Sequence, residues 1–239
     1  MTDSDATTPE RDRPARPPVT RPTVTGGRRR WSRSVRVWAA AVAGTVVLTM
    51  LVSTFVMQPF LIPSGSMEGT LQVGDRVLVN KLAYRFGGEV ERGDIIVFDG
   101  TGSFVAEGED PGLLGGLLRR AGAAVGLVQS SENDYVKRVI GVGGDRVRCC
   151  DGQGRLEING EPLDEPYLYP GDEPSEVMFD IEVPEGRLWV MGDHRSDSAD
   201  SRAYLGVPGG GTVPVDRVIG RVDLIGWPLS RWGWLPDHG

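Results

Sequence analysis

The chain has 239 residues, of which 33 are acidic and 26 basic, and it carries a formal net charge of −7. The charge is divided unevenly: residues 1–36 hold nine arginines against four acidic residues, a net +5, so the rest of the chain carries −12. An acidic main part is repelled by phosphate backbones, which argues against nucleic acid as a partner.

Residues 1–34 are predicted to form a disordered, basic cytoplasmic tail. They are poor in apolar residues and rich in Pro, Thr, Arg and Asp, so they cannot bury enough surface to offset the entropy of the chain. We expect the basic residues of the tail to meet anionic lipid and to fix the orientation of the chain in a membrane.

Residues 35–57 are predicted to form one transmembrane helix. Val37 to Met57 is a run of 21 residues without a charge, and the hydrocarbon core of a bilayer needs about 20 in a helix. Arginines precede the run, so we expect a single-pass protein of the cell membrane with its N-terminus in the cytoplasm and the remainder outside. The alternative is a cleavable signal peptide, but its apolar core would have only about 7–15 residues and would end at an A-x-A-like site, whereas this run ends in MQPFLIP.

Residues 58–230 are predicted to form an extracytoplasmic β domain. Short runs rich in Val and Ile are bounded by Gly, Asp or Pro, and several of them alternate with period two. Asn159-Gly160 is a favoured two-residue hairpin turn. The expected fold is therefore mostly β, an antiparallel catalytic domain anchored by one N-terminal transmembrane helix, with strands in residues 75–84, 93–98, 134–142, 155–160, 187–193 and 216–226.

Two segments depart from this pattern. Residues 100–133 form a Gly/Leu-rich insertion whose leucines stand at helical spacing, but its glycines weaken a helix by about 1 kcal/mol each. A mobile loop is therefore favoured over an element that dips into the membrane. The C-terminal tail, residues 231–239, follows Trp227 closely and contains Trp232 and Trp234. This segment either lies on a bilayer interface or caps the core.

The chemistry is concentrated in the stretch PSGSMEGTL, residues 63–71, which follows the predicted span at once. Two serines astride a glycine can be a simple turn, or one of them can be a nucleophile held near the membrane surface. A serine nucleophile needs a base. His238 is the penultimate residue and is expected to fray, so the candidate bases are His194 and the lysines, Lys81 and Lys137.

Lys137 lies in DYVKRVIGV, residues 134–142. In a strand, alternation puts Tyr135, Lys137 and Val139 on one side, and a lysine on an apolar side is desolvated, which lowers its pKa. Lowering the pKa from about 10.4 to 8 costs about 3 kcal/mol, and the neutral amine could then take the proton of a serine. His194 lies in MGDHRSDSADSR, residues 191–202, which by itself is read as a solvated loop, because Arg195 and Arg202 oppose a calcium site there.

Taken together, the motifs resemble the type I signal peptidases of bacteria. IPSGSMEGTL, RGDIIVF, DYVKRVIGVGGD and MGDHRSDSADSR follow the apolar run in the order of that family, and the resemblance covers Gln58 to about Gly226 apart from the insertion at 100–133. It implies a membrane-bound serine endopeptidase that cleaves signal peptides from exported preproteins by a Ser/Lys dyad, with no metal and no cofactor.

The resemblance also implies a role for individual residues. Ser66 would be the nucleophile and Lys137 the general base. Ser64 would donate its hydroxyl to the oxyanion, beside the backbone N–H of Ser66. The partners would be exported preproteins with signal peptides and membrane lipid. The substrate would bind as an added β-strand, with small side chains at −1 and −3.

Further residues would support this pair. Ser198 would orient the lysine amine, and Asp200 and Arg202 would form an ion pair behind it. The chain departs from the family pattern at Gly69, where proline is usual, and at His194, where asparagine is common. Neither departure removes a reactive group.

Two other functions and one redox state are left open by the residues alone. The chain could be a membrane-anchored β domain without activity, or a Ser/Lys peptidase dedicated to one protein. Cys149 and Cys150 are adjacent, and a bond between neighbours closes a strained ring. We therefore expect two free, buried thiols.

Overall fold

The computed structural model describes residues 33–105 and 133–236. The predicted tail lies outside the described residues except for its last two positions. Most of the insertion at 100–133 and the last three residues of the chain, His238 among them, lie outside as well.

Helix α1 (Arg33–Phe55) is apolar over most of its length, and its stretch Arg33–Val52 is long and apolar enough to cross a membrane. The sequence predicts an end at Met57, but the helix ends at Phe55 and strand β1 (Met57–Leu61) follows. Pro59 accounts for the difference, because a proline disfavours the helical conformation in the residue before it.

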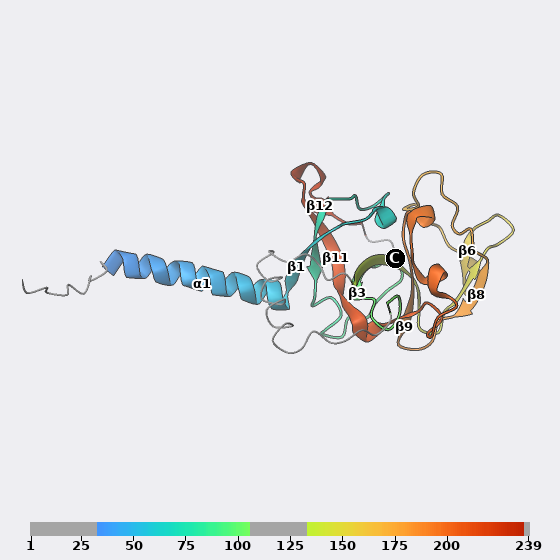
Figure 1. Ribbon diagram of the computed structural model, residues 1–239, viewed down its shortest axis with the longest axis horizontal. Helices are drawn as coiled ribbons and strands as arrows, with labels where there is room; N and C mark the ends of the chain where they lie inside the picture. Colours follow the sequence, from blue (N-terminus) through green and yellow to red (C-terminus); the bar gives the residue numbers. More distant parts are fainter. Residues whose placement is uncertain (1–32, 106–132, 237–239) are drawn as a thin grey trace, which may run out of the picture. The chain divides into compact units, whose positions relative to one another are not determined.

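The remainder of the described chain is mostly antiparallel sheet, as predicted (Figure 1). The larger sheet has the strand order β1-β2-β11-β3-β4-β9-β10, and β12 pairs with β11. Its further strands are β2 (Arg76–Asn80), β3 (Ile95–Asp99), β4 (Asp134–Val142), β9 (Arg187–Met191), β10 (Val213–Pro214), β11 (Val218–Trp227) and β12 (Gly233–Trp234). The smaller sheet, at one end of the β domain in Figure 1, has the order β7-β6-β5-β8 and consists of β5 (Arg146–Cys149), β6 (Leu156–Ile158), β7 (Glu161–Pro162) and β8 (Phe179–Glu182).

Short 3₁₀ helices connect these strands, and beside α1 they are the only helices of the described ranges. They are η1 (Gly65–Met67), η2 (Arg195–Asp197), η3 (Ser201–Tyr204), η4 (Val215–Arg217) and η5 (Leu229–Arg231). Ser66 lies in η1 and Arg202 lies in η3. No long helix follows α1 in the two described ranges.

All six predicted runs contain a strand, and β4 covers residues 134–142 as predicted. The hairpin turn between β6 and β7 is confirmed, because Asn159 and Gly160 have φ angles of 55° and 87° and join paired strands. The strands that the sequence did not predict are short, and β5 and β8 have four residues each. Strand β1 was not predicted because it continues the apolar run of the preceding helix.

The expectation of two free thiols is wrong in this structure. Cys149 and Cys150 are joined by a disulfide. The peptide bond between them is cis, and their Cα atoms lie 3.0 Å apart. Cys149 is buried at the end of β5, among the apolar residues that lie between the two sheets.

Candidate active site

Ser66 lies in a loop that is closed on itself, the Ser66 loop (residues 62–75), between β1 and β2. The backbone N–H of Ile62 donates to the carbonyl of Asp75 at 2.8 Å, and the N–H of Gly74 donates back to Ile62 at 2.9 Å. Met67 and Leu71 are fully buried in the apolar cluster beneath β1 and β2. Because burial of two large side chains stabilises a fixed loop position by a few kcal/mol, the serine is held rather than presented on a mobile turn.

Gly65 leaves room beside Ser66 for the Asp197 side chain. A Cβ on Gly65 would lie 2.9 Å from the Asp197 carboxylate, closer than real contacts allow. This permits η1 and η2 to approach each other closely. A second glycine that the sequence did not reveal is Gly192, since a Cβ there would collide with both the Ser198 hydroxyl and the Ser66 carbonyl.

Lys137 is buried in β4, with only 3% of its surface exposed. It pairs in register with Ile96 of β3, and its strand neighbours Tyr135 and Val139 pack in the apolar cluster that contains Ile96. The predicted alternation is therefore confirmed. The amine Nζ donates a hydrogen bond to Ser66 Oγ at 2.6 Å.

Burial lowers the pKa of Lys137 to about 8. Asp200 opposes this by favouring the ammonium, and Arg202 adds to it. Desolvation outweighs the nearby carboxylate because the amine is enclosed by the sheet and the Ser66 loop. Half of the amine is therefore neutral at about pH 8.

A cavity of about 190 Å³ opens beside the Ser66–Lys137 pair. Two extended segments line it, residues 60–64 of β1 and the loop after it, and residues 134–137 of β4. Ser64 lies on the first segment in an extended conformation and is exposed, one residue before η1. Strand β1 is at the end of the larger sheet, and within the described residues it pairs with β2 alone, which leaves its other edge available to an incoming strand.

Ser198, Asp200 and Arg202 lie together behind the pair. Arg202 holds the buried Asp200 carboxylate with an ion pair of 2.8 Å. Asp200 also accepts hydrogen bonds from the Ser198 hydroxyl at 2.8 Å and the Gly192 N–H at 3.0 Å. Burial alone would raise the pKa of Asp200, but the contacts from Arg202, Gly192 and Ser198 together outweigh it and the pKa is lowered. Ser198 thus donates its hydroxyl to Asp200, and a hydrogen bond between Ser198 and Lys137 is not among the contacts of the described residues.

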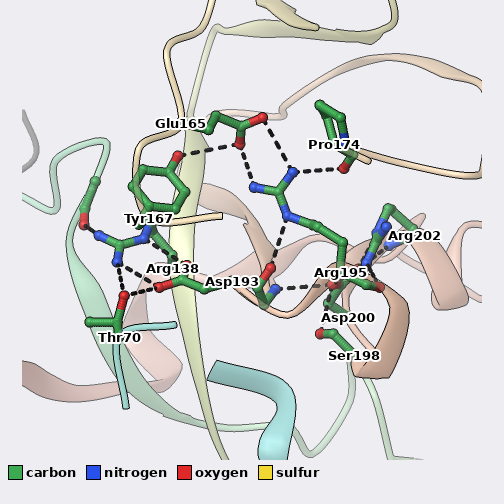
Figure 2. A network of polar contacts seen from close by, with 12 residues as sticks. Thr70, Arg138, Glu165, Tyr167, Pro174, Asp193, Arg195, Ser198, Asp200 and Arg202 are labelled. Carbon is green, nitrogen blue, oxygen red and sulfur yellow. Dashed lines mark hydrogen bonds and ion pairs between the residues drawn. The ribbon is translucent and has the colours of Figure 1, made fainter. Parts of the chain in front are cut away.

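A buried polar network that the sequence did not predict supports the same region (Figure 2). Arg138, adjacent to Lys137, forms a paired contact with Asp193 at 2.7 and 2.8 Å and is 1% exposed. Thr70 of the Ser66 loop donates its hydroxyl to Asp193 at 2.5 Å. The guanidinium of Arg138 lies over the Tyr167 ring, 3.9 Å from its centroid. The network therefore ties β4 and the loop after β9 to the Ser66 loop.

The network continues to Arg195, whose guanidinium pairs with Glu165 and donates to the carbonyl of Gly192 at 2.9 Å. The sequence carried one signal of such a network, because charged residues stand close to Lys137 in residues 134–142 and also in residues 191–202. Their pairing could not be read from the sequence, because it depends on strand register.

His194 has other partners than the serine hydroxyl. Its ring stacks on Tyr169 at 3.9 Å, and Nδ1 lies 3.5 Å from a Glu68 carboxylate oxygen. Its backbone N–H donates to the carbonyl of Ser66 at 3.2 Å. The histidine therefore supports the Ser66 loop from behind. No group of three or more metal-binding side chains lies together in the ranges 33–105 and 133–236.

A serine hydroxyl in contact with a buried lysine amine, beside a cavity edged by strands, defines a serine hydrolase in which lysine stands where histidine is more usual. Residues 35–227 match the family model described as signal peptidase, peptidase S26. The chain belongs to this family of serine peptidases.

Relatives with similar sequences carry the same description. A signal peptidase I of Mycobacterium tuberculosis (strain CDC 1551 / Oshkosh) is 43% identical over 226 residues, which cover 84% of this chain and 75% of the relative. A probable signal peptidase I of Mycobacterium leprae (strain TN) is 41% identical, with coverage of 82% and 78%. A solved structure of a signal peptidase I from Enterococcus faecalis V583 is 25% identical and covers 56% of this chain and 97% of that chain, with a TM-score of 0.35.

Proposed function

We propose that this chain removes signal peptides from exported preproteins, with Ser66 as the nucleophile and Lys137 as the general base. The observation that carries the proposal is the hydrogen bond of 2.6 Å between Lys137 Nζ and Ser66 Oγ, together with membership of the signal peptidase family. The lowered pKa of Lys137, about 8, suits the role, because a base works best when its pKa is near the working pH.

The reaction follows from this geometry. The neutral amine of Lys137 takes the proton of Ser66 as Oγ attacks the carbonyl carbon at the cleavage site, and an oxyanion forms. The resulting ammonium gives the proton to the leaving amine, the peptide bond breaks, and an ester joins the signal peptide to Ser66. Lys137 then takes a proton from water as the water oxygen attacks the ester carbonyl. The bond between the acyl carbon and Ser66 Oγ breaks, the ammonium returns the proton to Oγ, and the signal peptide leaves with a free carboxylate.

Ser64 is the second donor to the oxyanion in this proposal, beside the backbone N–H of Ser66. Its exposed, extended position at the mouth of the cavity supports the assignment. Donors aimed at the developing negative charge contribute a large share of the catalysis in acyl transfer.

Ser198 is assigned to orienting the amine of Lys137. The position of Ser198 supports this assignment, because its hydroxyl donates a hydrogen bond to Asp200, which is itself held by the ion pair with Arg202. With its proton engaged, Ser198 Oγ has lone pairs that could accept from an ammonium or an amine. The ion pair would therefore act through Ser198 on the base.

The substrate is proposed to bind as an added strand along the free edge of β1. The main-chain groups of β1 would supply affinity, and the cavity would select for small side chains at −1 and −3. The segments that line the cavity from β1 and β4 run on both sides of the pair, so a strand laid there would bring its carbonyl to Ser66.

Membrane lipid is the second proposed partner. Helix α1 would anchor the chain, with the arginines before it in the cytoplasm and the β domain outside. The C-terminal aromatic surface, composed of Trp227, Leu229, Trp232 and Trp234, is exposed by 53, 68, 61 and 74%. These side chains do not cap the core, and tryptophans of this kind are favoured at a membrane interface.

The test uses the full chain in lipid vesicles with a panel of exported precursors. The proposal predicts cleavage of several unrelated precursors at sites with small residues at −1 and −3, and none by Ser66→Ala. Cleavage of a single precursor would identify a dedicated peptidase. Failure of the wild-type chain to cleave any precursor would favour a membrane-anchored module without activity.

A further inference from the structure

Arg231 connects two segments that are far apart in the sequence, the Ser66 loop and the 3₁₀ helix η5. Its guanidinium donates to the Asp75 carboxylate at 3.0–3.2 Å and to the backbone carbonyl of Thr70 at 3.0 Å. Thr70 is in the middle of the Ser66 loop and Asp75 is at its base. One side chain from the C-terminal part of the chain therefore holds the loop at two points.

Both residues that Arg231 contacts, Asp75 and Thr70, also contact groups that support the active site. The carbonyl of Asp75 closes the loop by accepting from Ile62, which lines the cavity. The Asp75 carboxylate is 2% exposed and also accepts from the Gln72 N–H at 2.8 Å. At the other point, Thr70 contacts the buried Asp193 through its hydroxyl. A displacement of Arg231 would therefore act on the wall of the cavity and on the support of the Ser66 loop.

The backbone of Arg231 belongs to an exposed apolar part of the β domain. Leu229 and Trp232, on either side of it, are exposed by 68 and 61%. The turn is fixed internally, because the N–H of Arg231 donates to Pro228 at 2.9 Å and that of Trp232 donates to Leu229 at 3.4 Å. The exposed side chains and the guanidinium therefore belong to one hydrogen-bonded turn.

We propose that Arg231 is a positioning residue that makes the geometry of the Ser66 loop depend on the seating of the C-terminal aromatic surface on lipid. With Leu229 and Trp232 in the interface, η5 is held and Arg231 fixes Thr70 and Asp75. Without that seating, η5 is free to shift and the Ser66 loop loses this support. The inference rests on the proposed peptidase function and on lipid as the partner of this surface.

The test is a double-mutant cycle on the full chain in lipid vesicles, with a short soluble peptide substrate that needs no access through the bilayer. The variants are Arg231→Ala, the pair Leu229→Ala with Trp232→Ala, and their combination. We expect each to lower kcat by about tenfold with little change in KM, because small misplacements of a catalytic group cost rate more than binding. We expect the combination to be no worse than either alone, because residues that act through one another are not additive.

Arg231→Lys is the conservative variant. It keeps a positive charge beside Asp75 but cannot reach two acceptors with a planar fork, so its kcat should lie between those of the wild type and Arg231→Ala. Arg217→Ala is the matched control, because Arg217 is an arginine of another short 3₁₀ helix, η4, whose ion pair with Asp99 is exposed. It should leave kcat unchanged.

Two results would overturn the inference while leaving the peptidase function intact. One is a normal kcat in Arg231→Ala. The other is a combined loss equal to the product of the separate losses, which would mean that the surface and the arginine act independently. If Arg231→Ala does not fold by circular dichroism, the same criteria apply to Arg231→Lys. If the wild-type chain cleaves no peptide and no precursor, it is the proposed function that fails.

Discussion

Lys137 and Ser66 are 71 positions apart in the sequence, and in the structure the lysine amine lies 2.6 Å from the serine hydroxyl. The contact joins a central strand to a loop that is anchored by its own buried residues. Because Lys137 has a pKa lowered to about 8 by burial, the pair can exchange a proton near physiological pH.

The pH dependence of cleavage is the first prediction. The reactive form of Lys137 is the neutral amine, so activity should rise with pH through about 8 and be lost below it as the amine becomes protonated. The dependence of kcat/KM on pH, measured with a short peptide, gives this acidic limb of the pH profile. His194→Ala should keep both the activity and the limb. A limb near 6.5, the ordinary value for histidine, that disappeared in His194→Ala would assign the base to His194 instead.

Removal of either member of the pair should abolish cleavage. Ser66→Ala deletes the attacking oxygen, and Lys137→Met keeps the length of the side chain while it deletes the base. Since the two act as a unit, the double variant should be no worse than either single one. Precursor cleavage over long incubation measures the residual activity, and thermal unfolding checks that all three variants fold. Normal cleavage by Lys137→Met would contradict the assignment.

Ser64→Ala should be impaired but measurably active. The substitution removes one donor to the oxyanion and leaves the backbone N–H of Ser66, and loss of one such donor lowers the rate by about 10²–10³. Because the oxyanion exists in the transition state, kcat should fall while KM changes little. Ser64→Thr keeps a hydroxyl and should restore part of the rate. An unchanged kcat in Ser64→Ala would remove Ser64 from the site.

The sequence predicted what depends on local pattern. Alternation in residues 134–142 placed Lys137 on the buried side of its strand, and the order of motifs singled out Ser66. It did not predict the contact of Arg138 with Asp193, which are 55 positions apart, because such a pair depends on the register of β4 against β9. The disulfide of Cys149 and Cys150 was also missed, because adjacency in the sequence does not show whether two thiols are joined.

The last prediction concerns the free energy of unfolding. Arg138 and Asp193 are almost fully buried and form an ion pair at 2.7 Å, so Arg138→Met leaves the Asp193 carboxylate without its charge partner in the interior. The loss of one partner of such a pair destabilises a protein by about 3–5 kcal/mol. The matched control is Arg146→Met, because Arg146 pairs with Asp180 at the same distance but with side chains exposed by 68 and 42%. A solvent-exposed pair of this kind contributes little to stability, because water screens it.

Chemical denaturation of the two variants, in detergent micelles and at the same pH, measures the difference. Arg138→Met should unfold at a clearly lower denaturant concentration than the wild type, and Arg146→Met should unfold close to it. Because Thr70 of the Ser66 loop also contacts Asp193, Arg138→Met should lose activity at denaturant concentrations where it is still folded. Equal stability of the two variants would mean that the buried network is replaceable by an apolar side chain and that the Ser66 loop is held by its other contacts.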